Sequence, residues 1–215
     1  MKHQSLFTIA IMGVVLLGLS GCNQKEIINL INGDDLSNWE FVVQNNSVPA
    51  DEVYLANNGV VHVKGAPLGY MYTKEKYSNY KLHVEWRWVE GESNSGIFLL
   101  IENPKNPFPD GIECQLAAGR AGDLVLLGNS NLEEFVVPAG EERPAFPIVR
   151  KKGPACEKPA GEWNEADITV QNGAITILVN GEYQNTGTNK ITTGHIGLQS
   201  EGKAVQFRNV TLEKL

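Results

Sequence analysis

The sequence predicts an all-β fold, a jelly-roll sandwich of two antiparallel sheets. Residues 80–89 alternate apolar and polar side chains, which is the pattern of a half-buried strand. Asn-Gly pairs at 58–59, 172–173 and 180–181 separate runs rich in β-forming residues, and such pairs favour tight hairpins. No part of the body spaces its apolar residues as an amphipathic helix does. Many short strands in a chain of 215 residues therefore favour two packed sheets.

The expected strands follow one another between turn signals. A hairpin covers residues 53–64, and residues 168–184 form a three-stranded meander through two Asn-Gly turns. Further strands are expected at 80–89, 95–101, 111–117, 194–199 and 204–215. Residues 103–110 and 129–159 are rich in Pro, and Pro donates no hydrogen bond to a ladder. We expect these two segments to be long loops, which often border binding sites.

The N-terminus has the features of an export signal. An uncharged apolar run covers residues 6–19, and the sequence Leu-Ser-Gly-Cys that ends at Cys22 resembles the bacterial lipobox. This resemblance implies cleavage after Gly21 and diacylation of Cys22, which would tether the protein to a membrane through lipid alone. An ordinary signal peptide followed by an unmodified Cys is the alternative. The predicted location is the bacterial cell envelope, on the periplasmic side or the cell surface.

The predicted organisation is one domain behind a leader. We divide the chain into a signal peptide at 1–21, a lipidated Cys with a short tether at 22–26, and a single domain at 27–215. With 18 Lys and Arg against 25 Asp and Glu, the formal net charge is −7, and nucleic acid is a poor partner for such a chain. Cys114 and Cys156 would lie in an oxidising compartment, where they either form a disulfide or stay free.

Two stretches carry polar residues that suit chemistry on the face of a sheet. Glu113 and Gln115 are two residues apart, so both side chains project from the same face of a strand. His83, Glu85 and Arg87 share the polar face of the alternating strand. If the two strands were neighbours, these side chains would line one surface and Glu85 would meet Glu113, as paired carboxylates do in glycosidases. The alternative is that all five are solvated residues of half-exposed strands.

Other chemistries lack support in the sequence. No Cys and His spacing indicates a metal site, and there is neither a serine-hydrolase elbow nor a phosphate-binding loop. We therefore expect no metal and no cofactor. Trp86 and Trp88 alternate with charged residues and are expected in the core. Trp39 and Trp163 lie in polar contexts, where each can stack on a sugar ring or close the end of the sandwich.

Five motifs in a fixed order resemble one family. They are INGDDLSNWE near the mature start, SNSGIFL at 93–99, GIECQL at 111–116, GEWNEADITVQNGAITILVNG at 161–181 and GHIGLQSEGKAVQFRNVTLEKL at 194–215. Across residues 27–215 the chain is similar to the 3-keto-disaccharide hydrolase domain family, which is abundant in bacterial lipoproteins and secreted proteins. The resemblance implies a concanavalin A-like jelly roll with a saccharide ligand on its concave sheet.

The candidate site residues come partly from this resemblance and partly from the pattern of polar residues described above. The family's Glu-x-Gln strand matches Glu113 and Gln115, and its Asn-Ser-Gly turn begins at Asn94. The catalytic candidates are Glu113, Glu85 and His83. The substrate-binding candidates are Gln115, Asn94, Arg87, Trp163, Asn164, Gln199, Glu201 and Arg208.

The activity that the resemblance implies is hydrolysis of 3-keto glycosides or disaccharides. A ketone at C3 acidifies the C2 proton, so a base can remove it and expel the glycosidic oxygen from C1, after which water adds to the enone. Glu113 is the expected base. Arg87 or Arg208 is expected to stabilise the enolate. His83 or His195 is the candidate for protonating the leaving group.

Two departures from the family pattern leave other functions open. Many relatives carry Arg near positions 99–101, where this chain has Leu, Leu and Ile. Relatives also have a Gly-x-x-Tyr-Gly run where this chain reads GDLVLLGN at 122–129. Both changes remove polar or aromatic groups. The alternatives are therefore a non-catalytic, lectin-like surface lipoprotein, or a surface protein that binds no saccharide.

Overall fold

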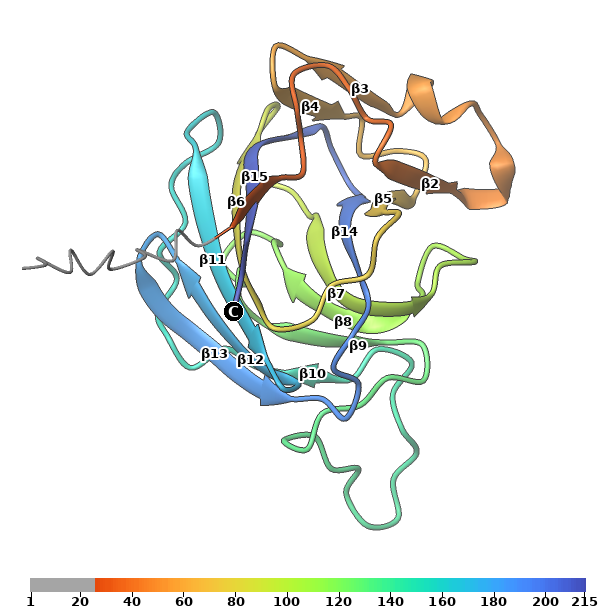
Figure 1. Cartoon of the computed structure of the whole chain (residues 1–215). Coiled ribbons are helices and arrows are strands. Elements are labelled where there is room, and N and C mark those ends of the chain that lie inside the picture. Colours follow the sequence, from red (N-terminus) through yellow and green to blue (C-terminus); the bar gives the residue numbers. More distant parts are fainter. Residues whose placement is uncertain (1–25) are drawn as a thin grey trace, which may run out of the picture.

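The computed structural model describes residues 26–215, in which two antiparallel sheets face each other (Figure 1). The predicted all-β sandwich is confirmed. The predicted signal peptide and the lipidation site at Cys22 lie outside the described residues. Within residues 26–215, no helix has the length and apolar character needed to cross a membrane.

One sheet has eight strands, in the order β13-β12-β11-β6-β15-β4-β3, with β1 paired to β15. Their bounds are β1 Ile27–Asn29, β3 Tyr54–Asn57, β4 Val60–Val63, β6 Tyr80–Trp88, β11 Asn164–Gln171, β12 Ala174–Val179, β13 Glu182–Thr188 and β15 Val205–Lys214. The other sheet has seven strands, in the order β10-β9-β8-β7-β14-β5-β2. Their bounds are β2 Trp39–Val43, β5 Gly69–Thr73, β7 Gly96–Asn103, β8 Asp110–Gln115, β9 Leu124–Leu127, β10 Ile148–Val149 and β14 His195–Ser200. Two short 3₁₀ helices, η1 Gln44–Asn46 and η2 Ala50–Glu52, lie between β2 and β3.

The Asn-Gly pairs at 58–59, 172–173 and 180–181 form the predicted hairpin turns. Residues 58–59 join β3 to β4, residues 172–173 join β11 to β12, and residues 180–181 join β12 to β13. Both residues of each pair have positive φ. Asn and Gly reach this conformation at low cost, and it matches the twist of the flanking strands. The local sequence therefore fixes the hairpin and the meander.

The strand period decides which side chains meet between the sheets. Leu82, Val84 and Trp86 of β6 and Ile112 and Cys114 of β8 are each at most 1% exposed. They belong to one apolar cluster that joins the two sheets. Burying a large apolar side chain contributes about 1.5–3 kcal/mol, so this core fixes how the sheets stack. The residues between them in sequence then point away from the core, on opposite sides of the sandwich.

The seven-stranded sheet is also covered on its outer face, the face that points away from the shared core. We call this second set of buried residues the outer apolar cluster. Its members are Tyr70, Tyr72, Phe98, Ile101, Val125 and Leu127, with Val42, Phe108 and Ile148 packed against them. Phe108 lies in the predicted loop 103–110, and its ring centroid is 4.7 Å from that of Phe146. The predicted loop 129–159 holds Phe146 and, apart from β10, is irregular; its first part extends beyond the sandwich in Figure 1.

The structure decides two questions that the sequence left open, whether Cys114 and Cys156 form a disulfide and whether Trp39 can contact a sugar. Cys114 is buried between the sheets and Cys156 is partly buried, and both thiols are free. The Cys156 Sγ donates to the Val179 carbonyl at 3.2 Å instead of forming a disulfide. Trp39 is 2% exposed, and its Nε1 donates to the Leu30 carbonyl at 2.7 Å. Trp39 therefore closes the sandwich, and no sugar can stack on it.

Candidate active site

The predicted site residues separate into two groups on opposite sides of the molecule. Strand β6 pairs with β11 and β15 in the eight-stranded sheet, whereas β8 pairs with β7 and β9 in the seven-stranded sheet. The expectation that these strands are neighbours is wrong, because the Trp86 and Cys114 side chains lie between them in the core. Glu85 and Glu113 point away from that core in opposite directions. The two carboxylates cannot meet as a glycosidase pair.

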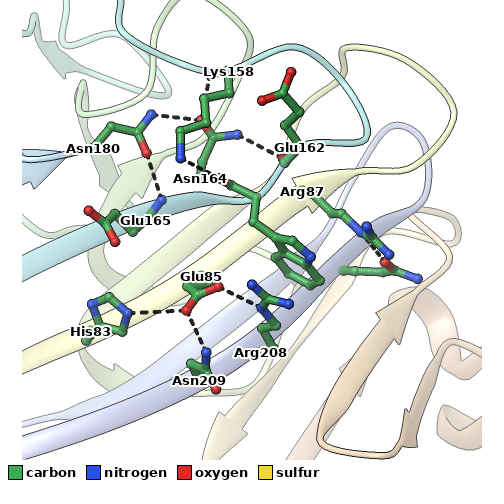
Figure 2. Close-up of polar contacts among 12 residues, drawn as sticks. His83, Glu85, Arg87, Lys158, Glu162, Asn164, Glu165, Asn180, Arg208 and Asn209 are labelled. Carbon is green, nitrogen blue, oxygen red and sulfur yellow. Dashed lines mark hydrogen bonds and ion pairs between the residues drawn. The ribbon is translucent and has the colours of Figure 1, made fainter.

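One group forms a cluster on the outer face of the eight-stranded sheet, which we call the arginine–tryptophan cluster (Figure 2). The guanidinium carbons of Arg208 and Arg87 lie 4.0 Å and 4.6 Å from the centroid of the Trp163 ring. Arg208 Nε donates to Glu85 at 2.6 Å, and Arg87 Nε donates to Gln206 at 2.6 Å. Cations at this distance from an indole attract it, so these contacts hold the loop that carries Trp163 against the sheet.

Glu85 is fully engaged within this cluster. It accepts hydrogen bonds from Arg208 and Asn209, and His83 Nε2 lies 3.9 Å from it (Figure 2). Burial alone would raise the pKa of Glu85, but the bonds from Asn209 and Arg208 and the Arg208 charge lower it below its usual range. The other ring nitrogen of His83 lies 2.8 Å from Asp167. A carboxylate held ionised by this many partners is a weak base, which favours a structural role for the cluster.

Asn164 is also occupied by its own chain. Its side chain is buried, and its Oδ1 accepts from the Lys158 backbone N–H at 2.7 Å and from Asn180 Nδ2 at 2.9 Å. Asn180 Nδ2 also donates to the Cys156 carbonyl at 2.8 Å. These bonds tie the loop before β11 to the hairpin after it. Asn164 therefore positions a loop and leaves little hydrogen-bonding capacity for a ligand.

The other group of predicted residues surrounds Glu113 on the outer face of the seven-stranded sheet. Glu113 pairs with Phe98 of β7 and Val125 of β9, and it is only 3% exposed. Its carboxyl group lies over Gly96 of β7, where a Cβ atom would collide with Oε1. A glycine at position 96 is therefore needed for the carboxyl group to turn toward β14, the next strand across the sheet.

Three more predicted residues lie near Gly96 and Glu113, at the start of β7 and the end of β14. Gln199 lies in β14 and is fully buried, Glu201 follows the end of that strand, and Asn94 precedes β7. The Ser95 hydroxyl donates to the Gln199 carbonyl at 2.8 Å, which ties the start of β7 to the end of β14. We call the site formed by Asn94, Glu113, Gln199 and Glu201 the carboxylate recess.

Polar atoms in the carboxylate recess are buried without hydrogen-bond partners. They are Asn94 Oδ1, Glu113 Oε1, and both amide atoms of Gln199. Gln199 and Asn94 lie close enough to Glu201 to lower its pKa, although neither Gln199 atom makes a hydrogen bond of regular geometry. An unpaired buried polar atom costs about 1–3 kcal/mol, so such a concentration indicates a place where a ligand supplies the missing partners.

The recess favours the neutral form of Glu113. Burial and then the charge of Glu201 raise the pKa of Glu113 well above its usual value, while the charge of Arg120 partly opposes them. Burial also raises the pKa of Glu201, against the opposing contacts with Gln199 and Asn94. Carboxyl groups with raised pKa values keep their protons to a higher pH than usual, which suits groups that give and take protons in catalysis. Gln115, by contrast, uses its Oε1 to accept from the Leu116 and Ala117 backbone N–H groups.

Sequence reasoning missed two buried tyrosines beside the recess, Tyr70 and Tyr72. Tyr70 pairs with Gln199 across β5 and β14, and Tyr72 of the same strand contacts the His195 ring, with the centroids 5.3 Å apart. His195 Nδ1 lies 2.7 Å from the Thr73 carbonyl, which can only accept, so that nitrogen carries a proton. The alternation of Tyr70 and Tyr72 in the sequence is the signal that could have placed them on one face.

The fold and the recess define a jelly-roll β-sandwich with a buried carboxyl group on the outer face of one sheet. The chain belongs to the family of 3-keto-alpha-glucoside-1,2-lyase-like domains, whose model matches residues 26–213. It is 25% identical to the 3-keto-disaccharide hydrolase of Bacteroides thetaiotaomicron, in a match that covers 65% of this chain and 60% of that protein. The chain thus spans about three fifths of the length of this curated relative.

Solved structures with the same fold are also known. A candidate glycosyl hydrolase from Parabacteroides distasonis is 21% identical, with a TM-score of 0.63 over 88% of this chain and 94% of that chain. The carbohydrate-binding module CBM66 from Bacillus subtilis is 10% identical, with a TM-score of 0.62 over 82% of this chain and 96% of that chain. At these identities the similarity shows the jelly-roll fold. Both an enzyme-type and a binding-type domain use it.

Proposed function

We propose that this protein cleaves 3-keto glycosides in the carboxylate recess, by elimination followed by hydration. The observation that carries the proposal is the buried carboxyl group of Glu113, which has an oxygen without a hydrogen-bond partner in a site where both amide atoms of Gln199 also have none. The family to which the chain belongs and its curated relative are named for a lyase and a hydrolase of 3-keto sugars. An elimination, which is a lyase reaction, followed by addition of water amounts to hydrolysis overall. The proposed reaction therefore agrees with both names.

The chemistry requires proton transfer more than a strong nucleophile. The ketone at C3 makes the C2 proton acidic, so one group must remove that proton and another must protonate the departing oxygen at C1. Water then adds to C1 of the enone, with a proton returned to C2. Carboxyl groups whose pKa lies near the working pH suit both transfers, and burial moves Glu113 in that direction.

The unpaired atoms of the recess suit the hydroxyl groups of a sugar. The Gln199 amide offers both a donor and an acceptor, and Asn94 Oδ1 offers an acceptor. An amide N–H directed at the C3 oxygen would also stabilise the negative charge that forms there in the enolate. Gln199 takes the role that the sequence suggested for Arg87 or Arg208, since both arginines lie on the opposite side of the sandwich.

The site's location in the cell is part of the same proposal. Cys22 would carry the lipid, and a short tether would hold the domain at the surface of a bacterial membrane. There the domain would encounter glycosides that come from the surroundings of the cell. The support is the apolar run at 6–19 and the lipobox-like sequence that follows it. Labelling cells with a radioactive fatty acid tests this: the protein should be labelled, and a Cys22→Ser variant should not be.

A substrate panel tests the function. The purified protein is incubated with methyl 3-keto-glucoside, 3-keto disaccharides and their unoxidised parents, and released sugar is followed by chromatography. We expect release from the keto compounds alone, because only they have an acidic C2 proton. Equal cleavage of the unoxidised parents would indicate an ordinary glycosidase. Binding without release, measured by calorimetry, would indicate the lectin-like alternative.

A further inference from the structure

The carboxylate recess brings together two carboxyl groups from strands on either side of β7. Glu113 lies in β8, and Glu201 follows the end of β14. The Glu113 carboxyl group occupies the space that a side chain at Gly96 of β7 would fill, which carries it toward β14. The Glu201 charge acts on Glu113 there.

The surroundings of the two carboxyl groups differ. Glu113 is 3% exposed, one of its oxygens has no partner, and Arg120 is the cation whose charge opposes the effect of Glu201 on it. Glu201 is only partly buried, and the amide groups of Asn94 and Gln199 favour its ionised form. Two nearby carboxyl groups in such a site share one proton, because their charges repel. The proton belongs mainly on the deeper group, Glu113.

We infer that the two groups divide the proton transfers of the cleavage reaction, with Glu201 as the base for the C2 proton and Glu113 as the acid for the leaving oxygen. The inference rests on the proposed function and deepens it. It also revises the expectation that Glu113 is the base. The physical reason is that a buried carboxyl group that already holds a proton can donate it but cannot accept another.

The scheme balances over the whole reaction. In the elimination, the electron pair of the C2–H bond forms the C1=C2 double bond as the C1–O bond breaks. The proton from C2 goes to Glu201, and the proton of Glu113 goes to the leaving oxygen. In the hydration, the ionised Glu113 takes a proton from water as its oxygen bonds to C1, and Glu201 returns its proton to C2. The pair holds one proton at the start and at the end, and its total charge is constant.

Hydrogen exchange separates the two roles. The probe is 1,5-anhydro-3-keto-glucitol, a 3-keto sugar without a glycosidic leaving group, and exchange of its C2 proton in D₂O is followed by NMR against an enzyme-free control. We expect Glu201→Gln to lower enzyme-dependent exchange by about 10²-fold or more, as loss of a general base does. Glu113→Gln should retain most of the exchange, since no leaving oxygen has to be protonated. Glu182→Gln, which changes an exposed carboxylate on β13, is the matched control.

Leaving-group dependence provides the second readout. A nitrophenolate leaves without protonation, so Glu113→Gln should recover activity on 4-nitrophenyl 3-keto-glucoside relative to the methyl glycoside, and Glu201→Gln should not. The division of roles would be overturned if Glu201→Gln exchanged the C2 proton of the probe at the wild-type rate. It would also be overturned if Glu113→Gln lost as much activity on the nitrophenyl glycoside as on the methyl glycoside. If the wild-type protein neither exchanges the probe nor cleaves either glycoside, the proposed function itself fails. Circular dichroism confirms that each variant is folded.

Discussion

Glu113→Gln is expected to lower kcat for cleavage of methyl 3-keto-glucoside by about 10²- to 10⁴-fold, the range for loss of general acid–base catalysis. Gln has nearly the same shape as Glu but cannot exchange a proton, so the substrate should still bind. Steady-state kinetics on the methyl glycoside measures the effect, with Glu182→Gln as the control for loss of a carboxylate elsewhere. A variant that keeps at least half of the wild-type kcat would remove Glu113 from the mechanism.

The same variant should be more stable than the wild type at neutral pH. Burial raises the pKa of Glu113 in the folded protein above its pKa in the unfolded chain. The stability that the protonated form contributes is fully present at pH values below the pKa of the unfolded chain. It is lost as the pH rises from there through the pKa of the folded protein. Gln does not titrate. Thermal unfolding should therefore favour Glu113→Gln over the wild type more at pH 8 than at pH 4. A difference that grows toward low pH would contradict the raised pKa.

Trp86→Ala is expected to have the largest effect on stability, with a loss of about 3–5 kcal/mol. Trp86 is fully buried, and its ring meets the Trp88 ring edge to face with centroids 6.5 Å apart. Removing it leaves a cavity at the point where β6 packs on the other sheet. For a domain of this size the midpoint of thermal unfolding should fall by roughly 10 °C. Scanning calorimetry of the purified variant measures this shift.

Trp163→Ala is the control for the loss of stability that we expect of Trp86→Ala. Trp163 is partly exposed and held mainly by the two arginines, and a cation–π contact of this kind contributes about 0.5–1 kcal/mol at an exposed site. Its loss should lower the midpoint much less than the loss of Trp86. Equal shifts for the two variants would mean that the arginine–tryptophan cluster is as important to stability as the core.

Local sequence carried enough information to predict the sandwich. The Asn-Gly pairs fix hairpins because both residues tolerate positive φ, and the alternation along 80–89 marks a strand with one buried face. Strands β5 and β9 were not predicted. They are buried on both faces, so their sequences GYMYT and LVLL lack the alternation that identifies a half-exposed strand.

The candidate site was predicted only in part. The two-residue period showed that Glu85 and Glu113 both face away from the core, but it cannot show to which sheet each strand belongs. Sheet membership depends on pairing between strands far apart in the sequence, such as β6 with β15. Asn94, Gln199 and Glu201 were candidates for substrate binding, and in the structure Glu201 lies near Glu113 and beside Asn94 and Gln199. It could not reveal that Arg87, Trp163 and Arg208 form a separate cluster.

Positions that depart from the family pattern lie beside the recess. Ile101 takes part in the outer apolar cluster, as do Val125 and Leu127 from the stretch that reads GDLVLLGN. The outer face next to Glu113 is therefore packed with apolar side chains from the chain itself. In the proposed function, this leaves the polar end of the face, where Asn94 and Glu201 lie, as the part that receives the sugar.

The most direct test of the eliminative mechanism is the rate of cleavage of methyl 3-keto-glucoside that carries deuterium at C2. If a carboxyl group of the recess removes this hydrogen during cleavage, the deuterated substrate should react more slowly than the ordinary one, because the C2–H bond breaks in the elimination. Equal rates for the two substrates would mean that breaking the C2–H bond does not limit cleavage, and this result would contradict the account.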